Sequence, residues 1–158
     1  RLEFRVAAGD TAALFGDRKE VVFQTGTSSG ELLFTAKIGQ WTESFVLPLN
    51  PALVEFTDTR ASRAAGALEV HLTGFDNTRS LSALQFTFFG RDGTPLSQGA
   101  VKADLTAEFA RYFGSSTLGG AFALKATFPV TGDAAAITAV EVEAVNRTGT
   151  MKSRRLVF

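Results

Sequence analysis

The sequence contains no cysteine and only one histidine among its 158 residues. Without cysteine the chain forms no disulfide, thiolate metal site, cysteine nucleophile or iron–sulfur cluster. The single histidine, His71, excludes a metal centre built from several histidines. Neither sign of charge dominates, because 16 Lys and Arg balance 16 Asp and Glu. With no strong electrostatic field, the chain is not expected to recruit nucleic acid or an anionic membrane surface.

Long hydrophobic runs and the polar aromatic residues are also scarce. No segment approaches the roughly 18 consecutive apolar residues of a transmembrane helix, so membrane insertion is not expected. Trp and Tyr occur once each, against 15 Phe. Because Phe has no polar group to bond, the aromatic residues point to core packing. Trp41 is the best candidate for an exposed sugar-binding platform, and a place in a core or interface is the competing interpretation.

Short segments in which apolar and polar residues alternate run along the whole chain. This period of two is typical of half-buried strands. The segments are residues 2–6, 21–23, 32–38, 41–49, 54–56, 68–73, 84–88, 122–128, 140–144 and 151–158. Turn signals such as Asp92-Gly93 separate them. The pattern predicts an all-β fold, an antiparallel Ig-like β-sandwich with one short crossover helix, preceded by a smaller β domain.

One stretch departs from the alternation and predicts a helix over residues 105–113. Its apolar residues Leu105, Phe109, Tyr112 and Phe113 recur at spacings of three and four, Asp104 precedes them as a cap, and Gly114 ends them. A helix this short is not stable alone in water, so we expect it to lie against a sheet.

The predicted organisation has three parts. Residues 1–50 form a small or incomplete Ig-like β domain, residues 51–58 a linker or first strand, and residues 59–158 the complete sandwich. Residues 1–58 carry five Lys or Arg and eight Asp or Glu, a net charge of −3, whereas residues 59–158 carry eleven and eight, a net charge of +3. Opposite charges favour contact between neighbouring molecules or within one molecule, and salt weakens both.

Three segments carry a resemblance to known proteins. Residues 22–30, followed by residues 32–38, resemble the closing strands of Ig-like repeats in large secreted bacterial proteins. Residues 74–81 and 116–124 are similar to a C-terminal module of the same setting. The resemblance implies an extracellular structural or adhesive role, and it carries over no active site, because such modules are defined by their fold.

The same resemblance makes residues 1–50 look like the later strands of a domain without its opening strands. One interpretation is that the chain, which begins at Arg1, is a fragment of a longer tandem protein. The other is that a strand from a neighbour completes the open sheet, as in donor-strand filaments.

Side chains that could support catalysis or metal binding have simpler interpretations. His71 lies on the polar side of its strand, which favours a solvent-facing histidine over a general base. Glu141 and Glu143 share the polar face of their strand, which favours a solvated stripe over paired catalytic carboxylates. On that face they can also lie opposite Lys125 or Arg154 of neighbouring strands. The aspartates at predicted turns and caps, Asp76, Asp92, Asp104 and Asp133, fit backbone roles better than a loop calcium site, which stays open.

Nucleotide and nucleic-acid sites are not indicated. Gly119-Gly120 precedes a strand and is not part of a dinucleotide-binding motif. In a continuous strand, Lys152 and Arg154 would share one face while Arg155 points to the other, so they form a charged strand edge.

The sequence therefore predicts a non-enzymatic module with no cofactor. We expect an extracellular structural or adhesive role, with neighbouring subunits or further domains of the same protein as partners. The alternative is a carbohydrate-binding module of a secreted bacterial protein. The candidate ligand or interface residues are Trp41, Phe75 and Arg79, the last two in the loop that ends at residue 79.

Overall fold

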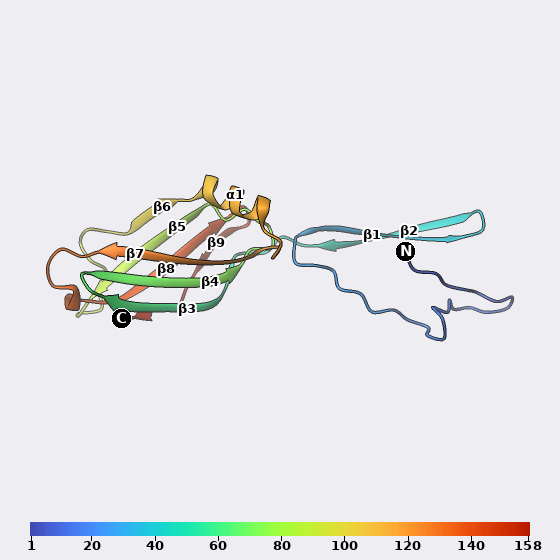
Figure 1. The fold of residues 1–158 in the computed structure, drawn as a ribbon, viewed down its shortest axis with the longest axis horizontal. Coiled ribbons are helices and arrows are strands. Elements are labelled where there is room, and N and C mark those ends of the chain that lie inside the picture. Colours follow the sequence, from blue (N-terminus) through green and yellow to red (C-terminus); the bar gives the residue numbers. More distant parts are fainter.

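The computed structural model describes residues 1–158 and shows an elongated molecule with two unequal parts (Figure 1). The smaller part is a hairpin of β1 (Gly30–Ile38) and β2 (Trp41–Leu49), preceded by residues 1–29, which contain no regular strand. The larger part is a β-sandwich that begins near Val54, the first residue of the core. The all-β fold with one short helix is confirmed.

Two antiparallel sheets make the sandwich. The three-stranded sheet has the order β3-β4-β7, where β3 is Glu55–Ala64, β4 is Ala67–Phe75 and β7 is Ala121–Pro129. The other sheet has the order β10-β8-β5-β6, with β9 also paired to β8. Its strands are β5 (Ala83–Gly90), β6 (Val101–Asp104), β8 (Ile137–Asn146), β9 (Gly149–Lys152) and β10 (Leu156–Val157).

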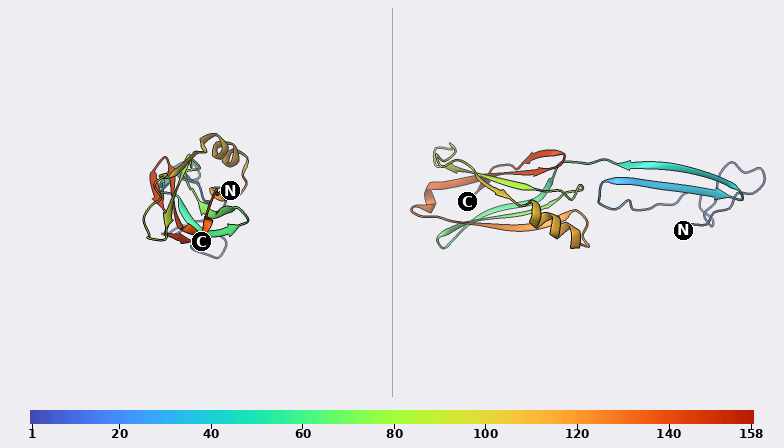
Figure 2. Two further views of the ribbon diagram at one scale, coloured as in Figure 1. Left: turned by 90° about the vertical axis from the view of Figure 1, so that its left-hand side faces the viewer. Right: turned by 90° about the horizontal axis from the view of Figure 1, so that it is seen from above.

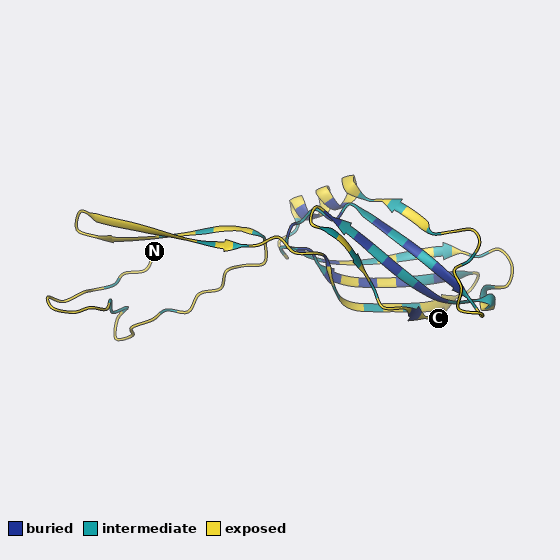
Figure 3. Ribbon diagram, turned by 180° about the vertical axis from the view of Figure 1, so that it is seen from behind, coloured by how far each residue is buried: buried dark blue, intermediate teal, exposed yellow.

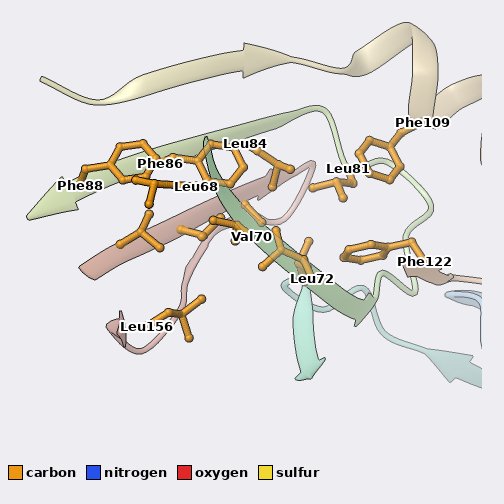
Figure 4. Close-up of a cluster of buried hydrophobic side chains, with 14 of the residues drawn as sticks. Leu68, Val70, Leu72, Leu81, Leu84, Phe86, Phe88, Phe109, Phe122 and Leu156 are labelled. Carbon is orange, nitrogen blue, oxygen red and sulfur yellow. The ribbon is translucent and has the colours of Figure 1, made fainter. Parts of the chain in front are cut away.

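The core lies between the two sheets and is made by the predicted alternation. Two buried rows are Leu68, Val70 and Leu72 on β4 and Leu84, Phe86 and Phe88 on β5 (Figure 4). A third row is Val140, Val142 and Ala144 on β8. Phe128 of β7 reaches across the layers, with its ring centroid 4.8 Å from that of Phe86 and 5.0 Å from that of Phe88. Each such aliphatic or aromatic side chain contributes about 1.5–3 kcal/mol when it is buried. Apolar burial is therefore concentrated in this part of the molecule.

The crossover helix α1 spans Thr106–Ser115, one to two residues later than predicted. Asp104 does support its start, because Asp104 Oδ1 accepts hydrogen bonds from the Thr106 amide (3.0 Å) and Thr106 Oγ1 (2.7 Å). The predicted end at Gly114 is wrong, since Gly114 lies inside the helix. The last turn continues to Ser115, whose hydroxyl donates to the carbonyl of Arg111 at 3.1 Å. Phe109 and Phe113 are buried on the face toward the sandwich.

Two predicted strands near the N-terminus do not form. Residues 2–6 contribute only an isolated bridge between Arg5 and Leu14, and residues 21–23 contain no strand. Alternation describes side-chain polarity, but a strand also needs a neighbour to accept its backbone hydrogen bonds. These segments have no regular partner strand in this molecule.

Two further differences concern the edges of the sandwich. Residues 57–66 lie between the predicted strands 54–56 and 68–73, yet they supply most of β3, an edge strand with largely exposed side chains. The expected last strand, residues 151–158, is broken between Lys152 and Leu156. There Ser153 Oγ accepts a hydrogen bond from the Val142 amide at 2.9 Å, in place of the regular ladder.

Candidate functional site

The hairpin presents an apolar face that the rest of the molecule leaves largely uncovered. Its register pairs Leu32 with Leu47, Phe34 with Phe45, and Ile38 with Trp41, so alternate residues of both strands share one face. Toward the tip, the exposed fractions are 55% for Ile38, 79% for Trp41 and 63% for Phe45. We call these three residues the tip patch. Figure 3 shows the hairpin mostly in the colour of exposed residues, in contrast to the sandwich.

The N-terminal segment covers part of the same face. The ring of Phe23 lies 4.8 Å from that of Phe34, between their centroids. Near the base of the hairpin, Leu32, Phe34, Leu47 and Leu49 are half-buried. The tip patch receives no comparable cover, so it is the part of the face that is free to contact another molecule.

The opposite face of the hairpin is more polar. Thr35 and Ser44 lie opposite each other with their hydroxyl oxygens 3.1 Å apart, and Lys37 lies opposite Thr42. Leu33 and Val46 form one exposed apolar pair on this face. The hairpin thus has a predominantly apolar face and a mixed face.

Asn77 ties the hairpin to the sandwich. Its Nδ2 donates to the carbonyl of Asn50 at 2.9 Å, and its Oδ1 accepts from the Ala52 amide at 2.9 Å. Its carbonyl accepts from the Ser29 amide at 2.7 Å. One residue of the sandwich therefore bonds the chain just before the hairpin and just after it. We call this set of bonds the Asn77 junction.

Asp76, beside Asn77 in sequence, organises the loop that carries the junction. Its side chain is fully buried and accepts five hydrogen bonds, two from Thr78 and one each from Ser80, Leu81 and Asn146. Burial raises the pKa of this carboxyl, but the hydrogen bonds from Thr78, Asn146 and Ser80 outweigh it, so the pKa is lowered below its ordinary value. Asp76 is therefore a stable anion that holds the loop in one shape.

Two glycines let neighbouring backbones approach at this end of the sandwich. A side chain at Gly120 would collide with the carbonyl of Asp76, and the Asp76 amide donates to the Gly120 carbonyl at 2.8 Å. Gly119 has a φ of +62° and lies against Thr27 of the N-terminal segment. The Gly-Gly pair thus serves close packing at the junction.

The three predicted site residues do not come together. Trp41 lies at the tip of the hairpin, whereas Phe75 and Arg79 lie beside the Asn77 junction at its base. Figure 2 shows how far the hairpin extends from the sandwich. Phe75 and Arg79 are half-buried, and Arg79 is the one non-glycine residue with positive φ, +52°. The loop from residue 75 to residue 79 is a packed structural turn, and Trp41 alone is freely accessible.

His71 lies on the exposed outer face of β4, as its place in the alternation predicts. Its Nε2 is 3.5 Å from Glu69 Oε2, and Lys125 Nζ is 2.6 Å from Glu69 Oε1. The hydrogen bond from Lys125 lowers the pKa of Glu69. These three side chains form a surface cluster across two strands, in which Lys125 and Glu69 are an ion pair.

The predicted partners of Glu141 and Glu143 are wrong. Glu141 pairs with Lys152 (2.7 Å) and Arg155 (3.1 Å), and the closest cation to Glu143 is Lys152 at 3.8 Å. The hydrogen bond from Lys152 lowers the pKa of Glu141, and Arg155 adds to the effect. Lys152 and Arg155 both reach Glu141 because the chain departs from a regular strand after Lys152. The prediction that their side chains point to opposite faces is therefore wrong.

The turn and cap aspartates engage the backbone. Asp92 accepts from the Thr94 amide at 3.0 Å and Asp133 from the Ala135 amide at 2.9 Å, as Asp76 and Asp104 do at their own positions. No group of three or more His, Asp or Glu side chains is placed to hold a metal ion.

Sequence reasoning missed the importance of Asn77. The cluster Asp76-Asn77-Thr78 between two predicted strands was the one indication in the sequence. Asp, Asn and Thr in series are typical of turns with side-chain to backbone hydrogen bonds. Such a cluster does not reveal that its amide reaches residues 50 and 52.

Comparisons with known proteins add no family assignment at this point. No protein-family model and no curated protein matches the chain. No helix in it has both the length and the hydropathy needed to cross a bilayer.

Proposed function

We propose that the chain is a non-enzymatic structural or adhesive module of an extracellular assembly, in which the β1–β2 hairpin packs against β-structure supplied by a neighbouring chain. The observation that carries this proposal is the tip patch, three large apolar side chains held away from the sandwich by the Asn77 junction. The resemblance of residues 22–38 and 74–81 to Ig-like modules of secreted bacterial proteins supports the extracellular setting.

The energetics favour a partner for the hairpin. An isolated two-stranded hairpin is only marginally stable in water, whereas three or more strands with a buried apolar face are stable. Burial of Ile38, Trp41 and Phe45 would each contribute about 1.5–3 kcal/mol. Both outer edges of the hairpin also lack a paired strand, so a neighbour can add a strand there.

Removal of the tip patch tests the proposal. Sedimentation velocity and light scattering should show that the purified chain associates as its concentration rises. The double variant Ile38→Ser with Phe45→Ser should associate much less. The matched control is Lys37→Ser with Thr42→Ser on the opposite face of the same hairpin, which should associate like the wild type. A wild-type chain that stays strictly monomeric from micromolar to millimolar concentration would contradict the proposal.

A second function is favoured by the exposure of Trp41 alone. An exposed indole at the end of a hairpin can stack on the apolar face of a sugar ring, so the chain could be a carbohydrate-binding module. Glycan-array binding that disappears in Trp41→Ala, and persists in Tyr112→Ala on α1, would support this alternative. Equal binding by both variants and the wild type would contradict it.

A further inference from the structure

The sandwich is open along one side. Strands β6 and β7 each have only one hydrogen-bonded neighbour, so each leaves an unpaired edge. Between them lies a groove of about 410 Å³ with α1 among its walls. On the opposite side, β3 and β10 contact each other and narrow the gap between the sheets. Figure 1 shows the helix above the open side.

The groove is shaped to receive an extended chain with apolar side chains at alternate positions. Leu84 and Phe86 of β5 line it, as do Leu124, Ala126 and Phe128 of β7. These three residues of β7 are half-buried, because no further strand covers them. An added strand beside β7 would bond the unpaired backbone edge and cover this row at the same time.

The N-terminal segment has the matching pattern and lacks a regular partner strand. In Arg1–Val6, the residues Leu2, Phe4 and Val6 alternate with charged ones. Leu2 is 64% exposed and Val6 42% exposed, and the segment forms no regular strand. It lies beside the hairpin, away from the sandwich, in both long views (Figures 1 and 2). A second copy is therefore the natural donor.

We propose that the groove between β6 and β7 binds residues 1–6 of a second copy of this chain as an added strand beside β7. The inference rests on the proposed function, and it names the receiving site and the donated segment. Residues 1–58 carry a net charge of −3 and residues 59–158 one of +3, which favours a head-to-tail approach of two molecules. The donated segment itself carries Arg1, Glu3 and Arg5, so its binding depends on its apolar side chains and on backbone pairing.

Side-chain polarity sets the register. With Leu2, Phe4 and Val6 turned into the groove, Glu3 points outward beside Lys125, which is exposed on the outer face of β7. In the parallel direction Phe4 lies beside Ala126, the smallest residue of the inward row.

Because the native chain has no cysteine, disulfide trapping reports this contact cleanly. Glu3→Cys and Lys125→Cys are introduced into separate full-length chains, which are then mixed and oxidised. Cα atoms of residues on adjacent strands lie within the range that a disulfide spans. We expect a crosslinked heterodimer, with the bond between residues 3 and 125 identified by peptide mass spectrometry.

The matched control replaces Lys125→Cys by Arg60→Cys. Arg60 lies in the same cross-strand row, through His71, but on β3 at the far edge of the same sheet. We expect the yield with Arg60→Cys to be at least several-fold lower. Adding Ala126→Glu to the Lys125→Cys chain should block the crosslink by placing a charge in the groove, whereas Ala123→Glu on the outer face should not.

The outcomes separate this inference from the proposal on which it rests. Equal crosslinking at residues 60 and 125, or no effect of Ala126→Glu, overturns the assignment of the groove. Association that depends on the tip patch without any link between residues 3 and 125 also overturns it, yet leaves the proposed structural role intact. A monomeric chain that forms no link contradicts both.

Discussion

Asp76 shows how one buried carboxylate can shape a loop. Five donors surround it, and no buried side-chain polar atom in the structure lacks a partner. A buried donor that loses its acceptor costs its full desolvation penalty, which exceeds the net gain of an ordinary hydrogen bond. The effect of removing Asp76 is therefore governed by the groups left behind.

We predict that Asp76→Ala lowers the free energy of unfolding by about 2–4 kcal/mol, because the buried amides of Ser80 and Leu81 lose their acceptor. Urea denaturation followed by fluorescence measures this change. The control is Asp92→Ala, which removes an equivalent Asp-to-Thr turn in an exposed place and should have a much smaller effect. Equal losses would show that burial of Asp76 does not matter.

The lowered pKa of Asp76 predicts acid sensitivity. A carboxyl whose folded pKa lies below its unfolded value of about 3.9 stabilises the fold above that pH, and the stabilisation is lost as the pH falls toward the folded pKa. The urea concentration at the unfolding midpoint should therefore decrease as the pH is lowered from about 5 to about 3. The Asp76→Asn variant should be less stable at neutral pH, and its stability should depend less on pH in this range. The variant Asp17→Asn, at an exposed position, should behave like the wild type. A wild-type slope in Asp76→Asn would assign the acid sensitivity to other groups.

Strand β4 and the hairpin illustrate opposite situations for a strand. β4 is paired on both sides, by β3 and β7, and buries Leu68, Val70 and Leu72 between the sheets. β1 and β2 have only each other. The stability of backbone hydrogen bonds against opening depends on how much apolar packing supports them.

Hydrogen exchange tests this difference. In dilute solution, the amides of β1 and β2 should exchange orders of magnitude faster than those of β4 and β8, because the hairpin opens without disturbing the core. At high concentration, hairpin protection should rise while β4 protection stays constant. If the hairpin amides of a dilute, monomeric sample were protected as well as those of β4, the hairpin would be stable on its own. That result would contradict its need for a partner.

The elongated shape of the molecule depends on a small number of polar contacts. No apolar core cluster links the hairpin to the sandwich, since every core residue lies at position 54 or later. The Asn77 junction and the bond from Arg147 Nη2 to Ser29 Oγ (3.0 Å) hold the two parts together. Their relative orientation is thus set by a few polar contacts, and a substitution at Asn77 removes two of them.

We predict that Asn77→Ala leaves the sandwich folded but loosens the orientation of the hairpin. Spin labels at Lys37→Cys and Arg60→Cys should give a broader distance distribution in the variant, and small-angle X-ray scattering should show a more variable length. Arg91→Ala, which removes the Arg91–Asp133 pair far from the junction in sequence, is the control and should keep the narrow distribution. An unchanged distribution in Asn77→Ala would mean that the other contacts suffice.

Residues 68–73 and 84–88 are strands that could be read directly from the chain, because the alternation of polarity is local and the two sheets bury one face of each strand. The alternating apolar residues of the tip patch could also be predicted from the sequence, but the exposure of their side chains could not. Exposure, the failure of residues 2–6 to pair, and the open groove depend on which strands become neighbours. The Asn77 junction and the convergence of Lys152 and Arg155 on Glu141 likewise join residues that only folding brings close. Local polarity therefore specified the central strands of the sandwich, whereas long-range pairing decided which other segments became strands and which surfaces this protein leaves free for a partner.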